Sequence, residues 1–477
     1  MPKTAGILLP IFSLPSDYSI GTLGREARNF VDFLVASGQS VWQILPIGPT
    51  LYEEYNSPYK TMSPFAGNPL LISLVDLTKM GLLNKPEIEI LKRENSRKID
   101  YKFLIENKNL LLHRVAKRGL SEKSKDYLSF LEENKDWIFE YSKYICIRML
   151  NTKTQPGEIK ISEKLQEEIM YIQYIFFMQF SKLKEYANSK NISLFGDIPF
   201  FEALNSHRVY YRREKFKLNA DGSPNKVAGV PPDQFSDKGQ IWGNPVYDFQ
   251  NLEKDNFKFI YDKFAFALKC YDIIRLDHFR GFESYYEIDY SSQDATNGNW
   301  VKAPGRQLID ILNKSFDMER IVAENLGYIT HEVSELMKYS GFYSMSVLQF
   351  AFEEQSEENI YLPENQEEKN CFYTGTHDNQ TAKSFIEANS ENKLLKKKLN
   401  DFFEKNEVYS FISYAMSAKS KMFIAPMSDY LSLGDEGRIN TPGTVEKNWK
   451  IMYKKDDFND KLAENIFDLC KKHKRLS

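Results

Sequence analysis

Apolar positions in the first fifty residues follow a rhythm of strand, helix and strand. Residues 5–10 form an apolar run that predicts a short buried strand. Apolar residues then recur at helical spacing across residues 27–34, and we expect Thr22 to cap this helix and Gly38 to follow its end. A second apolar run at residues 40–45 predicts another strand. Continuously apolar strands on either side of a helix indicate parallel pairing.

Six further apolar runs repeat this pattern, each preceded by helical sequence or by a loop. We expect strands at residues 193–197, 272–277, 320–324, 344–350, 371–375 and 421–426. Eight strands alternating with helices favour the α/β class, and a closed (β/α)8 TIM barrel over an open doubly wound sheet.

The spacing between the expected strands is uneven, and the two long gaps predict insertions. The gap between strands two and three is charged and helix-patterned, so we interpret residues 76–165 as the largest insertion, mainly helical. The next gap is rich in Gly and Pro, and we expect residues 199–252 to be a loop-rich insertion that covers a site. Residues 1–477 would then form one barrel domain. The basic runs 396–398 and 471–475 are most simply solvated helix faces or a tail.

Composition narrows the class of protein. Hydrophobic residues make up 42% of the 477 residues and charged residues 27%, as in ordinary globular proteins. A net charge of −3 and a pI of about 6.2 argue against a nucleic-acid partner, because proteins that bind nucleic acid are usually basic. The four cysteines form no CxxC pair, and no signal peptide or membrane span is visible. We therefore expect a cytoplasmic protein with neither a nucleic-acid nor a membrane partner.

Charged side chains fall at the ends of the expected strands, which in a barrel converge on one mouth. Strands three, four and five end in Asp197, Asp277 and Glu324, and the seventh is followed by His377 and Asp378. Arg275 precedes Asp277 by two residues, so both side chains project to the same side of the strand. His278 comes where that strand gives way to loop, and there it can donate to sugar hydroxyls.

Carboxylates gathered in this way repel one another, which is unfavourable unless they are paired or functional. Glycosyl transfer uses such a set: one acid protonates the leaving oxygen, and a second carboxylate, kept ionised by a nearby Arg, attacks the anomeric carbon. Taken singly, Asp277 and Glu324 are equally consistent with capping or structural pairing, and His377–Asp378 with a loop hydrogen bond. Their joint placement at successive strand ends favours a site.

A divalent cation is the rival chemistry for the same residue types. Metal sites in barrel hydrolases usually draw on more His, often as an HxH pair. This chain has six His in all, with no HxH and no HExxH. We therefore expect neither a metal nor an organic cofactor.

Eight motifs in order carry a resemblance over nearly the whole chain. They are GILLPIFSLPSDYSIGTLG, VWQILPIGPT, NSPYKTMSPFAGNPLLI, VAGVPPDQFSDKGQIWGNP, RLDHFRGF, IVAENLG, YTGTHDN and GRINTPGTVEKNW. With these motifs the chain resembles the 4-α-glucanotransferases, the amylomaltase or disproportionating-enzyme family, glycoside hydrolase family 77 of the α-amylase clan.

The resemblance implies a single catalytic domain that transfers α-1,4-glucan segments between malto-oligosaccharides with retention, using no cofactor and no metal. By position Asp277 would be the nucleophile, Glu324 the acid/base and Asp378 the stabiliser of the transition state. The residues expected to line the same subsite or to surround bound glucan are Arg275, His278, His377, Ser57, Tyr59, Asp197, Gln240, Trp242 and Asn440. Retention predicts carboxyl groups about 5–5.5 Å apart. Malto-oligosaccharides would be donor and acceptor for a monomer or a homodimer.

Two alternatives stay open. An α-1,4-glucan hydrolase would use the same carboxylates, because transfer depends on a bound acceptor that outcompetes water. A non-catalytic glucan-binding protein could keep the fold, although the three carboxylates are intact. Departures from the family pattern put acceptor preference in doubt rather than the reaction. They occur at Asn205, Arg208, Gln234, Gln380 and Ser428.

Overall fold

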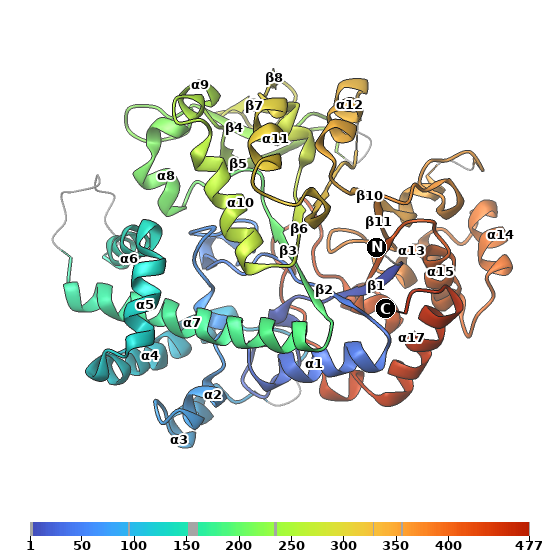
Figure 1. Cartoon of the computed structure of the whole chain (residues 1–477). Coiled ribbons are helices and arrows are strands. Elements are labelled where there is room, and N and C mark those ends of the chain that lie inside the picture. The colour runs from blue at the N-terminus through green and yellow to red at the C-terminus, as the bar shows by residue number, and fades with distance from the viewer. Residues whose placement is uncertain are drawn as a thin grey trace.

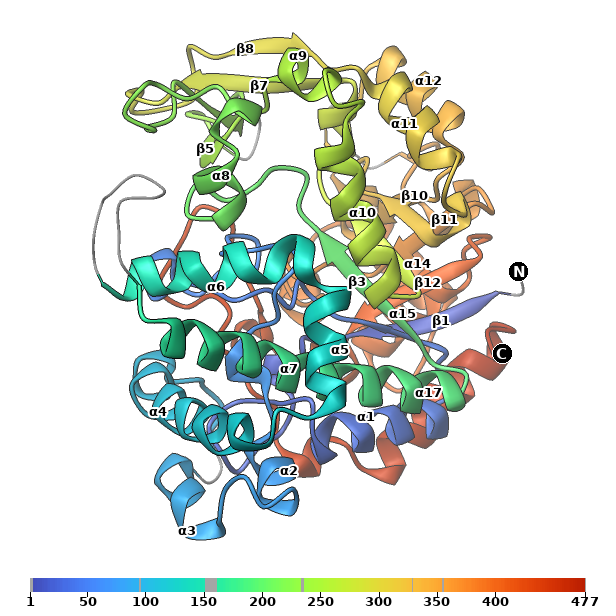
Figure 2. The same cartoon turned by 60° about the vertical axis from the view of Figure 1, so that its left-hand side comes forward.

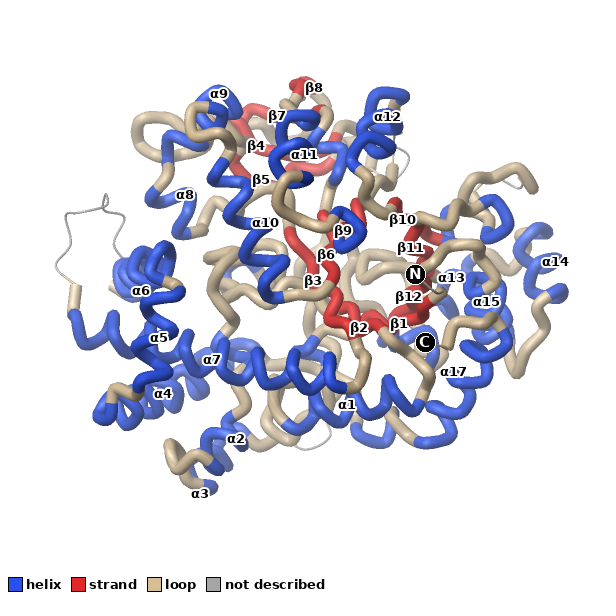
Figure 3. The backbone as a smooth tube through the Cα atoms, in the orientation of Figure 1, coloured by secondary structure: helices blue, strands red, loops and turns tan. Residues whose placement is uncertain are grey.

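The centre of the molecule is a sheet of eight parallel strands. The computed structural model describes residues 3–93, 96–150, 161–232, 236–327, 329–353 and 356–476. All eight strands lie where the apolar runs predicted them (Figures 1 and 3). They are β1 (Thr4–Leu8), β2 (Val41–Gln43), β3 (Ser193–Ile198), β6 (Ile273–Leu276), β9 (Ile321–Ala323), β10 (Ser344–Val347), β11 (Asn370–Tyr373) and β12 (Met422–Pro426).

The sheet closes on itself as a barrel. Its strand order is β10-β11-β12-β1-β2-β3-β6-β9, and the two ends meet through a parallel bridge between Val322 and Tyr343. Tyr343 donates its N–H to Ile321 O at 2.9 Å and accepts from the N–H of Ala323 at 2.8 Å. The prediction of a (β/α)8 barrel is therefore confirmed.

Buried strands of this kind form because apolar side chains point both into the barrel and out toward the helices. Every residue of β12 is buried, as are four of the five in β1. Gly6 of β1 has no room for a side chain, because a Cβ there would lie 2.6 Å from both Val41 O and the Ile424 side chain. Its absence lets β1 approach the two neighbouring strands closely.

Helices surround the barrel (Figures 1 and 2). They are α1 (Arg25–Ala36), α7 (Glu163–Ser189), α10 (Lys258–Cys270), α11 (Gly305–Asn313), α12 (His331–Ser340), α13 (Ala382–Ala388), α14 (Lys393–Asp401), α15 (Glu407–Met416), α16 (Met427–Tyr430) and α17 (Asp460–Lys472). The expected N-cap of α1 is wrong: Gly24, not Thr22, precedes the helix. Tertiary contacts decide this, since Leu23 N–H donates to Leu71 O at 2.9 Å and Gly24 packs against Ser73.

Five helices between β2 and β3 occupy the region in which we expected the helical insertion. They are α2 (Leu74–Lys79), α3 (Lys85–Ile88), α4 (Tyr101–Gly119), α5 (Lys125–Glu133) and α6 (Lys135–Met149). They gather on one side of the barrel, where α4 and α6 pack along α7 (Figure 2). Residues 151–160 of the proposed insertion 76–165 lie outside the described residues.

A second sheet corrects the expectation of a mainly loop-rich segment at residues 199–252. Its four antiparallel strands run in the order β5-β4-β7-β8. They are β4 (Lys226–Val230), β5 (Gln240–Pro245), β7 (Ser284–Asp289) and β8 (Asn299–Lys302). The Gly and Pro residues of β4 and β5 favoured the interpretation as loop. The sheet was not visible in the sequence because β4 also pairs with β7, which comes after barrel strand β6 in the chain. The same segment also contains α8 (His207–Tyr211) and α9 (Phe249–Glu253).

Short 3-10 helices connect these elements. They are η1 (Ile11–Ser13), η2 (Tyr52–Glu54), η3 (Pro69–Leu71), η4 (Glu89–Leu91), η5 (Leu120–Glu122), η6 (Arg213–Lys215), η7 (Phe279–Phe282), η8 (Met318–Arg320), η9 (Leu348–Phe352), η10 (Pro363–Asn365), η11 (Asp435–Gly437) and η12 (Lys455–Asp457). Within the described ranges, no helix is both long enough and apolar enough to cross a membrane.

The C-terminal basic run is not a wholly solvated tail. Arg475 is fully buried and donates to Met416 O and Ala418 O at 2.8 Å and to Thr4 O at 3.1 Å. These contacts hold the C-terminus beside the N-terminus at β1 (Figures 1 and 2). The sequence interpretation was wrong for Arg475 because backbone carbonyls, which no sequence pattern reveals, supply its partners.

Candidate active site

The charged residues expected at one mouth are brought together there. Asp197 lies in β3 and Arg275 in β6, whereas Asp277 and Glu324 directly follow β6 and β9. Neighbouring strand ends share backbone bonds at this level: Asp277 N–H donates to Ile198 O at 3.1 Å, and Glu324 N–H to Leu276 O at 2.9 Å. Parallel register therefore aligns the carboxylates side by side.

Arg275 is the hub of the site. Only 2% of it is exposed. Its Nη1 lies 2.7 Å from Asp197 Oδ2, and its Nη2 lies 3.0 Å from Asp277 Oδ1 and 3.1 Å from Glu324 Oε1. One guanidinium thus fixes three carboxylates, and a single nitrogen bridges Asp277 and Glu324.

Asp277 and Glu324 have opposite pKa shifts. Although 30% of the Asp277 side chain faces the mouth, desolvation by the surrounding protein and the adjacent negative charge of Glu324 raise its pKa. Desolvation also acts on Glu324, but the Arg275 charge and the backbone N–H of His278, which donates to Oε2 at 2.7 Å, outweigh it and lower its pKa. Of the two carboxyl groups, Asp277 therefore binds a proton more readily than Glu324.

His278 has a left-handed backbone, with φ of 55°. This conformation directs its N–H at Glu324 and sets its ring edge-on against Trp242, with ring centroids 4.8 Å apart. Trp242 in turn donates from Nε1 to Gln240 Oε1 at 3.2 Å. Strand β5 of the second sheet thereby carries Gln240 and Trp242 to the mouth of the barrel.

Asp197 and Tyr59 are hydrogen-bonded to each other next to Arg275. Tyr59 donates its hydroxyl to Asp197 Oδ2 at 2.8 Å and stacks on the His377 ring with centroids 5.1 Å apart. Burial raises the pKa of Asp197. Ser57 lies two residues before Tyr59 on the same loop, and among the described contacts its side chain makes none with the carboxylates.

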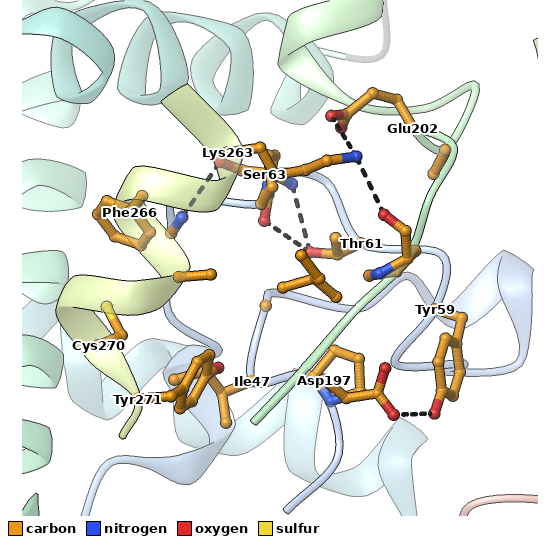
Figure 4. Close-up of a pocket in the computed structure, with 18 of the residues that line it drawn as sticks. Ile47, Tyr59, Thr61, Ser63, Asp197, Glu202, Lys263, Phe266, Cys270 and Tyr271 are labelled. Atoms are coloured by element: carbon orange, nitrogen blue, oxygen red, sulfur yellow. Dashed lines mark hydrogen bonds and ion pairs between the residues drawn. The ribbon is translucent and has the colours of Figure 1, made fainter. Parts of the chain in front are cut away.

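A cavity of about 40 Å³ lies beside Asp197 (Figure 4). Ile47, Thr61, Lys263 and Tyr271 are among its lining residues. Asp197 Oδ1 is buried here without a hydrogen-bond partner among the described side chains and backbone. The space is large enough for about two or three water molecules, which are the usual partners of such a buried oxygen.

Asp378 lies on the opposite side of the mouth and keeps 40% of its side chain exposed. Its Oδ1 accepts from Asn440 Nδ2 at 2.5 Å, and its Oδ2 lies 3.4 Å from His377 Nε2. Asn440 N–H also donates to His377 O at 3.0 Å. Burial lowers the pKa of His377, so this imidazole is neutral near pH 7.

Comparison with known proteins identifies the family of this chain. The family model for glycoside hydrolase family 77, described as 4-alpha-glucanotransferase, matches residues 9–457. The chain belongs to this family. A 4-alpha-glucanotransferase of Clostridium butyricum is 39% identical over 484 residues, covering 97% of this chain and 98% of that protein. The corresponding protein of Aquifex aeolicus is 37% identical, covering 95% and 96%.

A solved structure agrees in fold with this member of family 77. An amylomaltase from Streptococcus agalactiae in complex with acarbose superposes with a TM-score of 0.95 at 32% identity, and each chain is covered completely. The family and the enzyme class that the motifs implied are thereby confirmed.

Two departures from the family-77 pattern, Arg208 and Asn205, contact segments next to the site. Arg208 is 5% exposed, pairs with Glu202 at 2.7 Å and lies 3.4 Å from the ring centroid of Phe259. Asn205 donates from Nδ2 to Glu54 Oε1 at 3.1 Å, on the loop that leads to Tyr59. Both side chains therefore make their described contacts with neighbouring loops and helices rather than with the carboxylates around Arg275.

The other departures differ in their surroundings. Gln380 accepts at its backbone oxygen from Gln349 Nε2 at 2.8 Å, and Ser428 is buried. Gln234 lies outside the described residues. Among the described residues, no group of three or more His, Cys, Asp or Glu side chains has the arrangement of a metal site.

Two residues that contact the candidate site or its supporting loop were not assigned from the sequence. Arg438 donates from Nη2 to Asp378 O at 3.0 Å. Asp429 accepts from Thr374 and from Ala382, on either side of Asp378. Arg438 stands within a quoted motif and Asp429 follows the apolar run 421–426, but only their tertiary contacts assign them a task.

Proposed function

We propose that this family-77 enzyme transfers α-1,4-glucan segments between malto-oligosaccharides by a retaining double displacement. The observation that carries this proposal is the shared contact of Asp277 and Glu324 with one nitrogen, Arg275 Nη2. Two oxygens held at 3.0 and 3.1 Å from the same atom leave no room for the spacing of about 6.5–9.5 Å that inverting enzymes need. The geometry favours attack by a carboxylate over attack by a water between the two groups.

The roles follow the family motif. Asp277 attacks the anomeric carbon and forms a glycosyl ester, while Glu324 donates a proton to the departing 4-oxygen. In the second step Glu324 removes a proton from the acceptor 4-hydroxyl, which attacks the anomeric carbon and releases Asp277. Asp378 holds hydroxyls of the distorted sugar as positive charge develops on the ring.

Proton placement is the condition this mechanism must meet. Attack requires an ionised Asp277 and a protonated Glu324, whereas the free site favours the reverse distribution. The two carboxyl groups are coupled, so one proton belongs to the pair rather than to either residue. A glycosidic oxygen bound next to Glu324 accepts a hydrogen bond from the protonated form of Glu324 and so favours the proton on that residue. Arg275 remains in contact with Asp277 and stabilises its carboxylate. We propose that substrate binding completes the shift.

Transfer rather than hydrolysis requires that an acceptor displace water from the intermediate. Oriented reactants reach effective molarities of about 10⁵ M or more in favourable cases, enough to compete with bulk water. The segment 199–252 supplies Gln240 and Trp242 at the mouth, and we propose that it covers the site and forms part of the acceptor subsites. Residues 76–165 would form a helical insertion within one catalytic domain, 1–477.

Incubation of the EDTA-treated protein with maltotriose tests the proposal. Glucose together with maltopentaose and longer products would establish transfer without added metal. Glucose and maltose alone would identify a hydrolase. Binding of acarbose without any turnover would identify a glucan-binding protein, and the Asp277→Asn variant would then match the wild type.

A further inference from the structure

The turn that carries His377 and Asp378 is held at both ends by one buried carboxylate. Asp429, on α16 directly after barrel strand β12, is 1% exposed. Its Oδ2 accepts from the Thr374 hydroxyl at 2.7 Å, and its Oδ1 accepts from the Ala382 N–H at 2.8 Å. Thr374 follows β11 and Ala382 begins α13, so a single side chain closes the segment between them.

We propose that Asp429 is a positioning residue that sets the place of Asp378 in the mouth; this rests on the proposed function. Asp429 touches neither Asp378 nor the open mouth in the described contacts, so it acts through the turn. The turn itself is stiff: Asn379 Oδ1 accepts from the Thr376 N–H at 2.9 Å and from its hydroxyl at 2.8 Å. A stiff turn is placed by its ends, and both ends are bonded to Asp429.

The energetics of Asp429 point away from a purely stabilising role. Its two described partners are neutral donors, and burial raises the pKa of Asp429 to about 6. A buried carboxylate without a counter-charge pays a desolvation penalty that an apolar side chain would avoid. An apolar side chain would, however, release both ends of the turn and leave the Ala382 N–H without its acceptor.

Contacts at the crown of the turn depend on this placement. Arg438 Nη2 donates to Asp378 O at 3.0 Å, and Asn440 Nδ2 donates to Asp378 Oδ1 at 2.5 Å. Both contacts depend on the position of the turn relative to the end of β11. A misplacement of about 1 Å at a catalytic group lowers turnover by ~10²-fold. Because Asp378 acts most strongly in the transition state, the loss falls on kcat more than on KM.

Three variants separate positioning from packing. Asp429→Ala removes both tethers, and we expect kcat on maltotriose to fall by ~10²-fold with KM within about threefold. Asp429→Asn keeps an acceptor for the Ala382 N–H and turns its amide toward Thr374, whose hydroxyl can rotate, so activity should return to within about threefold of wild type. Thr374→Val removes one tether and should give an intermediate kcat.

Amide hydrogen exchange of residues 376–384 provides a readout that does not depend on the reaction. We expect faster exchange in Asp429→Ala than in Asp429→Asn or the wild type. Wild-type kcat or exchange in Asp429→Ala, or an Asp429→Asn variant as impaired as Asp429→Ala, would overturn the proposal. If Asp429→Ala does not fold, Thr374→Val decides by the same two measurements. A wild type without transfer would refute the proposed function, while exchange would still test the tether.

Discussion

Replacing Lys108 by Met should stabilise the protein at neutral pH and remove a pH-dependent part of its stability. Lys108 lies on α4, where the helical region packs on η3, and only 1% of it is exposed. Its Nζ donates to Leu70 O at 2.7 Å, and the described residues place no carboxylate against it. Such an ammonium is desolvated with one neutral acceptor, which is an unfavourable environment for the charge.

The magnitude follows from the pKa. Burial lowers the pKa of Lys108 from 10.5 to about 7, and each unit corresponds to 1.36 kcal/mol, so the full penalty is ~5 kcal/mol. Between these two values the unfolded chain binds one more proton than the folded protein, so this contribution makes stability rise with pH. The penalty is absent above pH 10.5 and grows as pH falls to about 7. Met removes it but leaves Leu70 O without a donor, which costs about 1–3 kcal/mol, so we expect a net gain of ~2 kcal/mol or more near pH 7.

Urea unfolding of wild type, Lys108→Met and Lys102→Met between about pH 7.5 and 9.5 tests this reasoning. The advantage of Lys108→Met over wild type should shrink by ~2.5 kcal/mol across this range. Lys102 is exposed on the same helix, so its variant should run parallel to wild type. Parallel curves for Lys108→Met and wild type would refute the argument, because Lys108 would then keep its charge in the folded state.

Three further substitutions test other parts of the molecule. Asp277→Asn should nearly abolish transfer while acarbose affinity, measured by calorimetry, stays within ~10-fold; more than a few per cent of wild-type rate would overturn its assignment as nucleophile. Trp242→Ala should raise KM for maltotriose by roughly 10-fold, since it removes an apolar face at the mouth; unchanged kinetics would make Trp242 a packing residue. Arg475→Met should lower the free energy of unfolding by about 3 kcal/mol with kcat unchanged, because the three carbonyls that lose their donor cost about 1–3 kcal/mol each, which together exceeds the desolvation penalty that Met removes; an unaltered melting temperature would contradict this.

The barrel was predictable because each of its strands is marked by the hydrophobic pattern of its own residues. Buried parallel strands such as β12 are continuous apolar runs, and their alternation with helices leaves few topologies. The second sheet was not predictable in this way. Strands β4 and β5 contain Gly229, Gly243 and Pro245, and β4 is completed by β7 from beyond β6. Pairing with a distant strand therefore outweighed the low strand propensity of the Gly and Pro residues in β4 and β5.

The carboxylates of the site were predictable from the same logic, because a strand end in a barrel fixes where a side chain points. The tethers that place them were not. Asp429 follows an apolar strand as Asp277 does, yet it faces neutral donors instead of the mouth. Arg475 sits in a basic run like any solvated tail, yet it is buried among carbonyls. In both cases the partners are backbone groups or hydroxyls that a sequence does not place.

Charge balance around Arg275 favours the binding of a proton by the neighbouring carboxylates. Arg275 supplies one positive charge against three carboxylates, Asp197, Asp277 and Glu324, all contacted by its guanidinium. Two uncompensated negative charges in a desolvated mouth are unfavourable, so the cluster lowers its energy by binding a proton. Burial is the main cause of the raised pKa values of Asp197 and Asp277, and the negative charge of Glu324 adds to the shift at Asp277. The arrangement that places Arg275 against Asp277 therefore also keeps a proton within reach of Glu324. It follows that neutralising Asp197 would lower the pKa of Asp277, because the negative charge of Asp197 helps to raise it.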